Sequence, residues 1–215
     1  TPATGPRILI KKGVDRRAVT AQLLTVLKEE LLGRVSSWHI LFPDEESSRN
    51  FQASDSWLER FGVQFHWFNQ GFRCFDDHLA TFNSKRRKEA RRERRRVAEQ
   101  GITFERLSGR DIGHEAIDTL FQCYQMTYRL RGSLGYLTRE FFEYAIERIP
   151  DAIRVGFAIR QNQRIAMSFC LRDATTLYGR YWGALHEVDC LHFETCFHQW
   201  ICLLYTSPSP RDLRK

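Results

Sequence analysis

The sequence predicts an α/β protein in which helices cover a mixed sheet. The 215 residues are 42% hydrophobic and 13% aromatic, a balance typical of a globular chain with its own core. Apolar residues recur at helical spacing in some segments and alternate in others, so both kinds of element are expected. The sequence has no apolar run near the ~20 residues that span a bilayer and no signal-peptide pattern. Six cysteines without a CxxC pair are typical of reduced thiols, and we expect a cytoplasmic protein.

The first third of the chain has the pattern of alternating strands and helices. Asp15 can cap a helix whose apolar side chains recur every four residues up to Leu31. A shorter helical piece is expected at residues 55–60, before Gly62. Strands are expected at residues 7–11, 37–42 and 63–68.

The rest of the chain predicts a strand, two helices, a three-stranded meander and a last helix. One long helix is expected from Phe75 to Gln100, ended by Gly101. Gln161-Asn162-Gln163 and Asp173-Ala174-Thr175 have the turn chemistry of antiparallel hairpins. The expected elements are a strand at 102–107, helices at 112–131 and 138–149, strands at 155–160, 164–171 and 176–182, and a helix from about Asp189.

The net charge of +7 resides in residues 85–96, which hold nine basic and two acidic residues. On a helix, four like-charged pairs lie at i,i+4 and cost roughly 1–2 kcal/mol together. RNA phosphates, the phosphates of a nucleotide-bearing donor or acidic residues of the same fold would relieve this repulsion. Alternatively, the stretch is a solvated face whose long side chains cover apolar surface. The candidate anion-binding residues are Lys85, Arg86, Arg87, Lys88, Arg91, Arg92 and Arg95.

An arginine between aromatic residues is the second candidate site. In the run Tyr178-Gly179-Arg180-Tyr181-Trp182-Gly183, a planar cation could hold an anionic or carbonyl group against an aromatic wall. Alternatively, Arg180 pairs with a carboxylate. His66 either faces a cleft or lies satisfied between aromatic residues. No GxSxG, Walker or dinucleotide-binding motif occurs, so the sequence does not favour nucleotide hydrolysis or dinucleotide redox chemistry.

The last helix holds two pairs of polar residues at i,i+4 spacing. His192 pairs with Cys196 and Glu194 with His198, but the two pairs lie on different helix faces. We therefore expect no metal site.

Several motifs in order resemble the bacterial FemAB-like family of peptidoglycan biosynthesis or recognition proteins, which have the GNAT acyltransferase fold. The resemblance covers nearly all of residues 7–201. It implies tandem GNAT-like units: residues 1–74 as the C-terminal part of a first unit, and 75–201 as a second unit that lacks its last strands. The motifs are Gln64-Phe65-His66-Trp67, residues 84–94, Tyr136-Leu137-Thr138-Arg139-Glu140-Phe141-Phe142, residues 177–183 and Leu191-His192-Phe193-Glu194.

The resemblance implies transfer of an acyl group to an amine of a cell-wall precursor or related small molecule. The co-substrate would be acyl-CoA or aminoacyl-tRNA, with no permanently bound cofactor. The usual acetyl-CoA motif of the fold, Q/R-x-x-G-x-G/A, fails here at Leu185, which disfavours acetyl-CoA. Glu194 and His192 are the candidates for base or positioning. The candidates for binding donor or acceptor are Arg180, Tyr181, Trp182 and His66.

Two other functions are compatible with the sequence. The protein could be a non-catalytic module that binds RNA or an envelope polymer through the basic helix, or the helix could simply bridge two units.

The C-terminal residues 202–215 differ from what precedes them. They resemble the translated read-through of a sequencing adapter, although a Pro/Ser-rich tail is the alternative. We therefore expect a non-native tail on a truncated, inactive fragment.

Overall fold

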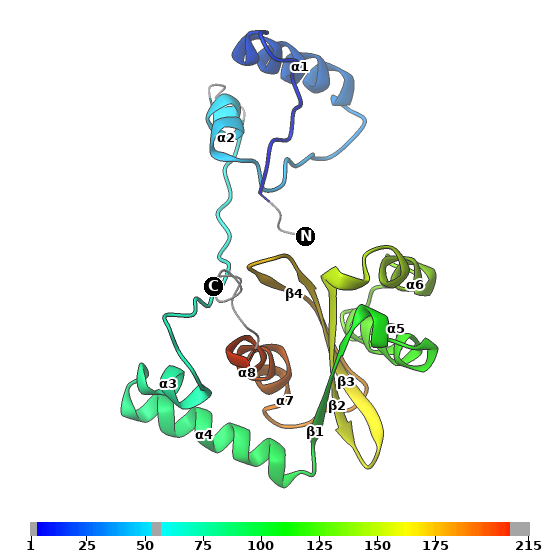
Figure 1. Cartoon of the computed structure of the whole chain (residues 1–215). Coiled ribbons are helices and arrows are strands. Elements are labelled where there is room, and N and C mark those ends of the chain that lie inside the picture. Colours follow the sequence, from blue (N-terminus) through cyan, green and yellow to red (C-terminus); the bar gives the residue numbers. More distant parts are fainter. Residues whose placement is uncertain (1–3, 53–56, 207–215) are drawn as a thin grey trace. The chain divides into compact units, whose positions relative to one another are not determined.

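A computed structural model describes residues 4–52 and 57–206 (Figure 1). The chain forms two compact units, residues 1–67 and 68–215, and each is described by itself. The division precedes the expected boundary at residue 74. That the first unit is part of a GNAT-like unit stays a prediction.

The first unit contains two helices, α1 (Arg16–Leu31) and α2 (Glu45–Gln52). The predicted cap is confirmed, because the Asp15 carboxylate accepts hydrogen bonds from the backbone N–H groups of Arg17 and Ala18 at 2.9 and 3.1 Å. The short helix lies earlier than predicted: residues 57–60 are not helical, and 55 and 56 lie outside the described residues.

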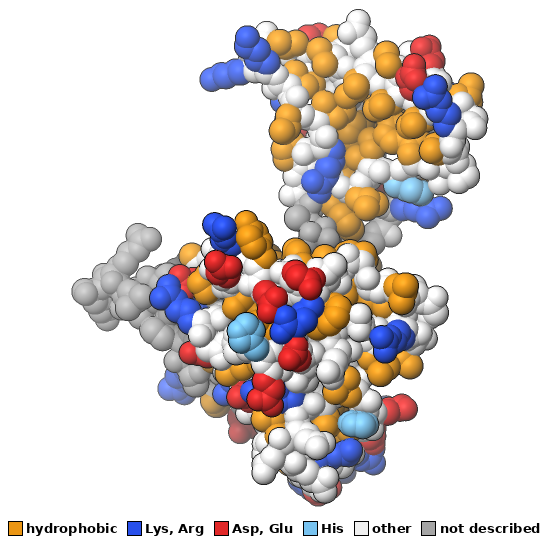
Figure 2. Space-filling view, turned by 90° about the vertical axis from the view of Figure 1, so that its right-hand side faces the viewer, with side chains coloured by type: hydrophobic (Ala, Val, Ile, Leu, Met, Phe, Trp, Pro, Cys, Tyr) orange, Lys and Arg blue, Asp and Glu red, His pale blue; other side chains and the backbone are white. Residues whose placement is uncertain are grey.

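The strands predicted at residues 7–11, 37–42 and 63–68 are wrong. Within the described part of the first unit, the only sheet-like pairing is a parallel bridge between Gly5 and Pro43. Leu9, Leu41 and Phe65 are 88%, 63% and 90% exposed, so the alternating apolar pattern covers no core here. Figure 2 shows many hydrophobic side chains at the surface of this unit. A strand needs a partner for its backbone groups, which local sequence cannot supply.

The second unit contains a four-stranded sheet of order β1-β2-β3-β4, in which every pairing is antiparallel. The predicted α/β class and the predicted order of a strand, two helices, a three-stranded meander and a last helix are confirmed, although the described strands of this sheet form no parallel pair, which a mixed sheet would contain. The predicted turn at Gln161 and Asn162 is also confirmed, with both residues left-handed at φ of 51° and 59°. The strands are β1 (Thr103–Ser108), β2 (Ile153–Arg160), β3 (Gln163–Arg172) and β4 (Leu177–Ala184).

Helices cover both faces of this sheet (Figure 1). On one face, α5 (His114–Arg129) and α6 (Arg139–Arg148) follow β1, with 3-10 turns at Gly109–Asp111 and Pro150–Ala152 before and after them. The core on that face includes Leu120, Phe142 and Phe157, and the core on the other includes Val97, Ala158 and Leu191. Burial on both faces explains why β2 and β3 read as almost continuous apolar runs.

The basic stretch lies in a helix that is separate from the one before it. The prediction of one helix from Phe75 to Gln100 is wrong, because α3 (Phe75–Ala80) ends before α4 (Ser84–Glu99) begins. Asn83 makes the break, since its side-chain oxygen accepts from the N–H of Arg86 at 2.9 Å and caps α4. Gly101, at φ 72°, follows the end of α4 as predicted.

The last helix is continuous from Leu191 to Thr206 but changes its winding. It consists of α7 (Leu191–Phe193), a π-helical turn at Glu194–His198 and α8 (Gln199–Thr206). The predicted start near Asp189 is confirmed to within two residues. Of the tail, residues 207–215 lie outside the described residues. Within the described ranges, no helix combines the length and apolar character that crossing a membrane requires.

Candidate functional site

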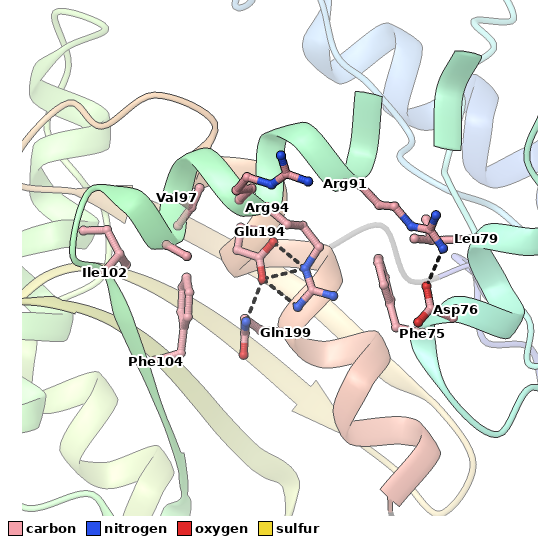
Figure 3. A pocket seen from close by; sticks show the side chains of 12 residues that line it. Phe75, Asp76, Leu79, Arg91, Arg94, Val97, Ile102, Phe104, Glu194 and Gln199 are labelled. Carbon is pink, nitrogen blue, oxygen red and sulfur yellow. Dashed lines mark hydrogen bonds and ion pairs between the residues drawn. The ribbon is translucent and has the colours of Figure 1, made fainter. Parts of the chain in front are cut away.

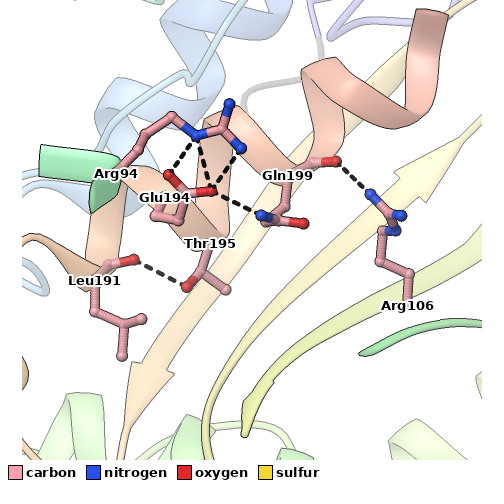
Figure 4. Close-up of polar contacts among 6 residues, drawn as sticks. All are labelled: Arg94, Arg106, Leu191, Glu194, Thr195 and Gln199. Carbon is pink, nitrogen blue, oxygen red and sulfur yellow. Dashed lines mark hydrogen bonds and ion pairs between the residues drawn. The ribbon is translucent and has the colours of Figure 1, made fainter. Parts of the chain in front are cut away.

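Glu194 forms a buried ion pair with Arg94 of the basic helix (Figure 4). Both carboxylate oxygens accept from the Arg94 guanidinium at 3.0–3.2 Å, and Gln199 Nε2 donates to Oε1 at 2.7 Å. The π-turn makes the last contact possible, because its wider winding aligns residues five apart. The Glu194 side chain is 5% exposed and that of Arg94 is 30% exposed.

These contacts bear on the two roles predicted for Glu194, base or positioning. A general base needs an oxygen directed at the proton it removes. The Glu194 oxygens are directed at Arg94 and Gln199, which fits positioning better. Arg94 was absent from the predicted site. The available signal was its spacing from Ala90 and Val97, four residues before it and three after it, which are buried and lie on the inward face of α4.

A cavity of about 460 Å³ lies beside this ion pair (Figure 3). Arg91 is held by Asp76 at 2.8 Å, and the Arg94 guanidinium lies 4.3 Å from the centre of the Phe75 ring. Arg95 also lines the cavity. The cavity therefore combines an apolar wall with a cationic edge. It is lined by Phe75, Asp76, Leu79, Arg91, Arg94, Arg95, Val97, Ala98, Ile102, Phe104, Glu194 and Gln199.

The structure divides the basic residues of α4 into two groups. Besides Arg91 and Arg94, Arg96 pairs with Asp189 at 2.6 Å and Arg92 lies 3.9 Å from Glu89. Acidic residues of the same fold therefore relieve part of the repulsion, one of the alternatives that the sequence left open. A second group makes no ion pair among the described residues: Lys85, Arg86, Arg87, Lys88 and Arg95.

A β-bulge places Arg180. Phe169 pairs with Tyr181 and Cys170 with Gly179, so Arg180 is the extra residue on β4. In a regular strand, neighbouring side chains point to opposite faces, but a bulge redirects one of them. Here the Arg180 guanidinium lies 4.4 Å from the centre of the Tyr181 ring.

Two tyrosine side chains contact this guanidinium, Tyr136 through its hydroxyl and Tyr181 through its ring. Arg180 Nη2 donates to Tyr136 Oη at 3.3 Å, and the Tyr136 and Tyr181 oxygens lie 3.2 Å apart. The carboxylate partner that was the alternative for Arg180 is absent among the described residues. Tyr136 belongs to one of the family motifs but was not among the predicted site residues, because no local pattern indicates that the connection between α5 and α6 reaches β4.

The tyrosines of this cluster differ in acidity. Hydrogen bonds from the Tyr181 and Tyr128 hydroxyls, with the nearby Arg180 charge, lower the pKa of Tyr136. Burial is the main cause that raises the pKa of Tyr128 and of Tyr181. The exposed phenol is therefore the most acidic of the three.

The two histidines among the predicted site residues belong to different units of the chain. The His192 ring packs 5.2 Å from the Trp182 ring, and partial burial lowers the pKa of His192, which keeps the imidazole neutral at neutral pH. His66 belongs to the first unit, where it contacts Gln64 at 3.3 Å. The structure thus joins Arg180, Tyr181 and Trp182 on β4 and brings His192 to Trp182. Within the described ranges, no three His, Cys, Asp or Glu side chains are grouped as a metal site would require.

Comparison with known proteins identifies a family. The model of the FemAB-like family, described as peptidoglycan biosynthesis/recognition, matches residues 1–205. No curated protein matches the sequence. Among solved structures, the chain is similar to the C-terminal DUF2156 domain of a putative lysylphosphatidylglycerol synthetase from Agrobacterium fabrum, with 14% identity and a TM-score of 0.47. That match covers 60% of this chain and 42% of the other.

Proposed function

Because this chain belongs to the FemAB-like family, we propose that it is an N-acyltransferase. It would transfer an acyl or aminoacyl group to an amine of a cell-wall precursor or related small molecule. The observation that carries the proposal is the bulge at Arg180, which directs a cation and hydroxyl groups to one exposed point of β4. Bulges of this kind commonly redirect a side chain beside an active site.

The chemistry fits the groups that lie on and beside β4. A neutral amine attacks the acyl carbonyl carbon, and the negative charge that develops on the carbonyl oxygen needs a cation or N–H donors. Arg180 would supply that charge. When the tetrahedral intermediate collapses, the bond between the acyl carbon and the donor breaks, and the donor leaves as the CoA thiol or as the tRNA hydroxyl after taking up a proton. An alkyl amine has a pKa of ~10 and is protonated at neutral pH, so it must lose a proton in order to react. The neutral imidazole of His192 would accept this proton, directly or through water.

The donor in this proposal is acyl-CoA or aminoacyl-tRNA. Both carry phosphates, and the α4 cations without an ion pair would attract either of them. A cytoplasmic location belongs to the same proposal.

The test is a transfer assay with the purified full-length gene product. Acyl-CoA and aminoacyl-tRNA donors are offered with cell-wall-precursor and small amines, and products are measured by mass. Arg180→Gln should lower kcat/KM by about 10²–10³-fold, the usual effect of losing one oxyanion donor. Arg129→Gln is the matched control, because Arg129 is an exposed arginine at the end of α5. Absence of turnover with every donor, or equal rates for both variants, would refute the proposal.

A second candidate function is a non-catalytic anion-binding module, and the unpaired cations of α4 favour it. Lys85, Lys88 and Arg95 are exposed and, at i, i+3 and i+10, lie on one side of the helix. A row of cations is the usual footprint for a phosphate chain. This function predicts binding that weakens steeply with salt and no turnover.

The same three residues supply the test. Changing all three to Gln should reduce the slope of log K against log salt concentration for single-stranded RNA binding by about two, since each phosphate contact contributes roughly 0.7. The control removes three exposed arginines elsewhere, and its slope should match that of wild type. RNA binding that both variants weaken equally would count against this function. The control residues are Arg129, Arg131 and Arg148.

A further inference from the structure

Tyr136 is exposed but firmly positioned by its two neighbours. A Cβ on Gly135 would lie 2.5 Å from Cε1 of Tyr124, so the backbone approaches that ring as only glycine allows. The N–H of Leu137 donates to the Tyr124 hydroxyl at 3.1 Å. Tyr124 is fully buried, whereas Tyr136 is 66% exposed. The connection between α5 and α6 is therefore anchored on a core side chain on both sides of Tyr136.

The Tyr136 oxygen is surrounded by hydrogen-bond donors. Arg180 Nη2 lies 3.3 Å away, and the Tyr181 hydroxyl oxygen lies 3.2 Å away. The Tyr128 ring packs edge-on against the Tyr136 ring, with 5.7 Å between their centres. Arg180 has no acceptor lone pair, so it can only donate here. A phenol oxygen has two lone pairs, so when Arg180 donates to one and the Tyr181 hydroxyl to the other, Tyr136 keeps its own O–H to donate to another group.

Packing alone does not explain why Tyr136, Tyr181 and Arg180 are held together. An exposed phenol needs no partner for stability, and holding an arginine and two tyrosine hydroxyls in fixed positions costs side-chain entropy. The bulge on β4 positions Arg180, and the close contact of Gly135 with Tyr124 positions Tyr136 beside it. Preorganised donors beside a fixed cation are what recognition of a charged oxygen requires.

We propose that Tyr136 and Arg180 together bind an anionic oxygen of the substrate, a carboxylate or a phosphate. The Tyr136 O–H donates one hydrogen bond, and the remaining N–H groups of Arg180 donate others. This inference deepens the proposed acyl transfer, because it names the group that orients a substrate at β4. It assigns Tyr136 a binding role that neither the family description nor the sequence motif states.

The test follows the ionisation of Tyr136 and requires no turnover. Tyrosinate absorbs in the near ultraviolet, so a pH titration of wild type minus Tyr136→Phe isolates this residue. Acetate or inorganic phosphate is then added at constant ionic strength, with chloride as the reference. If the anion binds only the protonated phenol, the midpoint of Tyr136 ionisation rises by about one pH unit at an anion concentration of ten times Kd. The reason is that binding multiplies the population of the protonated form by 1 + [L]/Kd.

Two further variants complete the experiment. In Arg180→Gln the midpoint should be higher without ligand, because the cation that favours phenolate is gone, and neither anion should move it. Tyr144→Phe is the control, since Tyr144 is an exposed tyrosine of α6 outside the cluster. It should leave the midpoint and its shift unchanged.

The outcomes separate the two ligand classes. A shift with acetate alone assigns a carboxylate, and a shift with phosphate alone assigns a phosphate; shifts with both support the shared chemistry. A midpoint that neither salt moves, or that moves equally in Arg180→Gln, overturns the inference. Failure here with successful transfer in the assay above would leave the acyltransferase proposal standing.

Discussion

Replacing Arg94 by Gln should destabilise the second unit through the carboxylate that it leaves behind. Glu194 is 5% exposed, so without Arg94 its charge would stay buried, and among the described residues only Gln199 would still donate a hydrogen bond to it. Breaking a fully buried ion pair costs about 3–5 kcal/mol. Arg94 itself is 30% exposed, and water reaching that side reduces the cost. Loss of the contact with Phe75 adds about 0.5–1 kcal/mol. We expect a loss of roughly 2–4 kcal/mol in the free energy of unfolding.

Thiol reactivity measures this change in the second unit alone. All six cysteines lie after residue 67, and Cys123 and Cys170 are buried. Their labelling in increasing urea therefore reports unfolding of that unit. The control is Arg95→Gln, an exposed neighbour without an ion pair, which should change stability by no more than about 0.5 kcal/mol.

Two results would contradict this reasoning. The first is an Arg94→Gln protein that is as stable as the Arg95→Gln control. The second comes from the double variant Arg94→Leu with Glu194→Leu, which removes both charges and should recover much of the loss. A double variant as unstable as the sum of its single variants would show that the buried charge is not the cause.

Three further predictions concern the same unit. Gly183→Ala should lower the melting temperature strongly, because its Cβ would lie 2.0 Å from the backbone oxygen of Cys123; a Tm equal to wild type would contradict that contact. Burial raises the pKa of the Cys123 and Cys170 thiols to about 12, so both should resist labelling in native protein at neutral pH, whereas exposed Cys74 should react quickly; equal rates would refute this. Burial lowers the pKa of His198 below its ordinary value near 6.5, so as pH drops the unfolded chain takes up a proton at this residue before the folded protein does, and the free energy of unfolding should fall. His198→Leu should weaken this pH dependence in urea titrations, and a pH dependence equal to that of wild type would contradict the prediction.

The local features of this fold were predictable because local chemistry decides them. Asp15 and Thr138 begin helices through hydrogen bonds to N–H groups within three residues. Gly101 supplies the left-handed backbone that follows a helix. The β2–β3 turn is likewise set by its own residues. Such interactions close within one turn of chain and need no knowledge of the rest of the fold.

The errors lie where a segment needs a distant partner. The alternating pattern of residues 7–11 suits a strand, but no strand forms there among the described residues because none pairs with it. The break between α3 and α4 was also missed. Asn83, an ordinary helix-cap residue, was the available signal, but the charge run after it had the stronger helical pattern.

The sequence by itself determined the α/β class, the helix–helix–meander order and the concentration of charge in residues 85–96, since composition and short-range spacing encode them. The tertiary structure alone decided which charges are neutralised and which groups meet. Arg94 pairs with Glu194, 100 residues further along the chain, and the Tyr136 hydroxyl bonds to that of Tyr181, 45 residues away. The physical reason is that hydrogen bonds and ion pairs act over a few ångströms in space, and only packing of the sheet and its helices brings such residues that close.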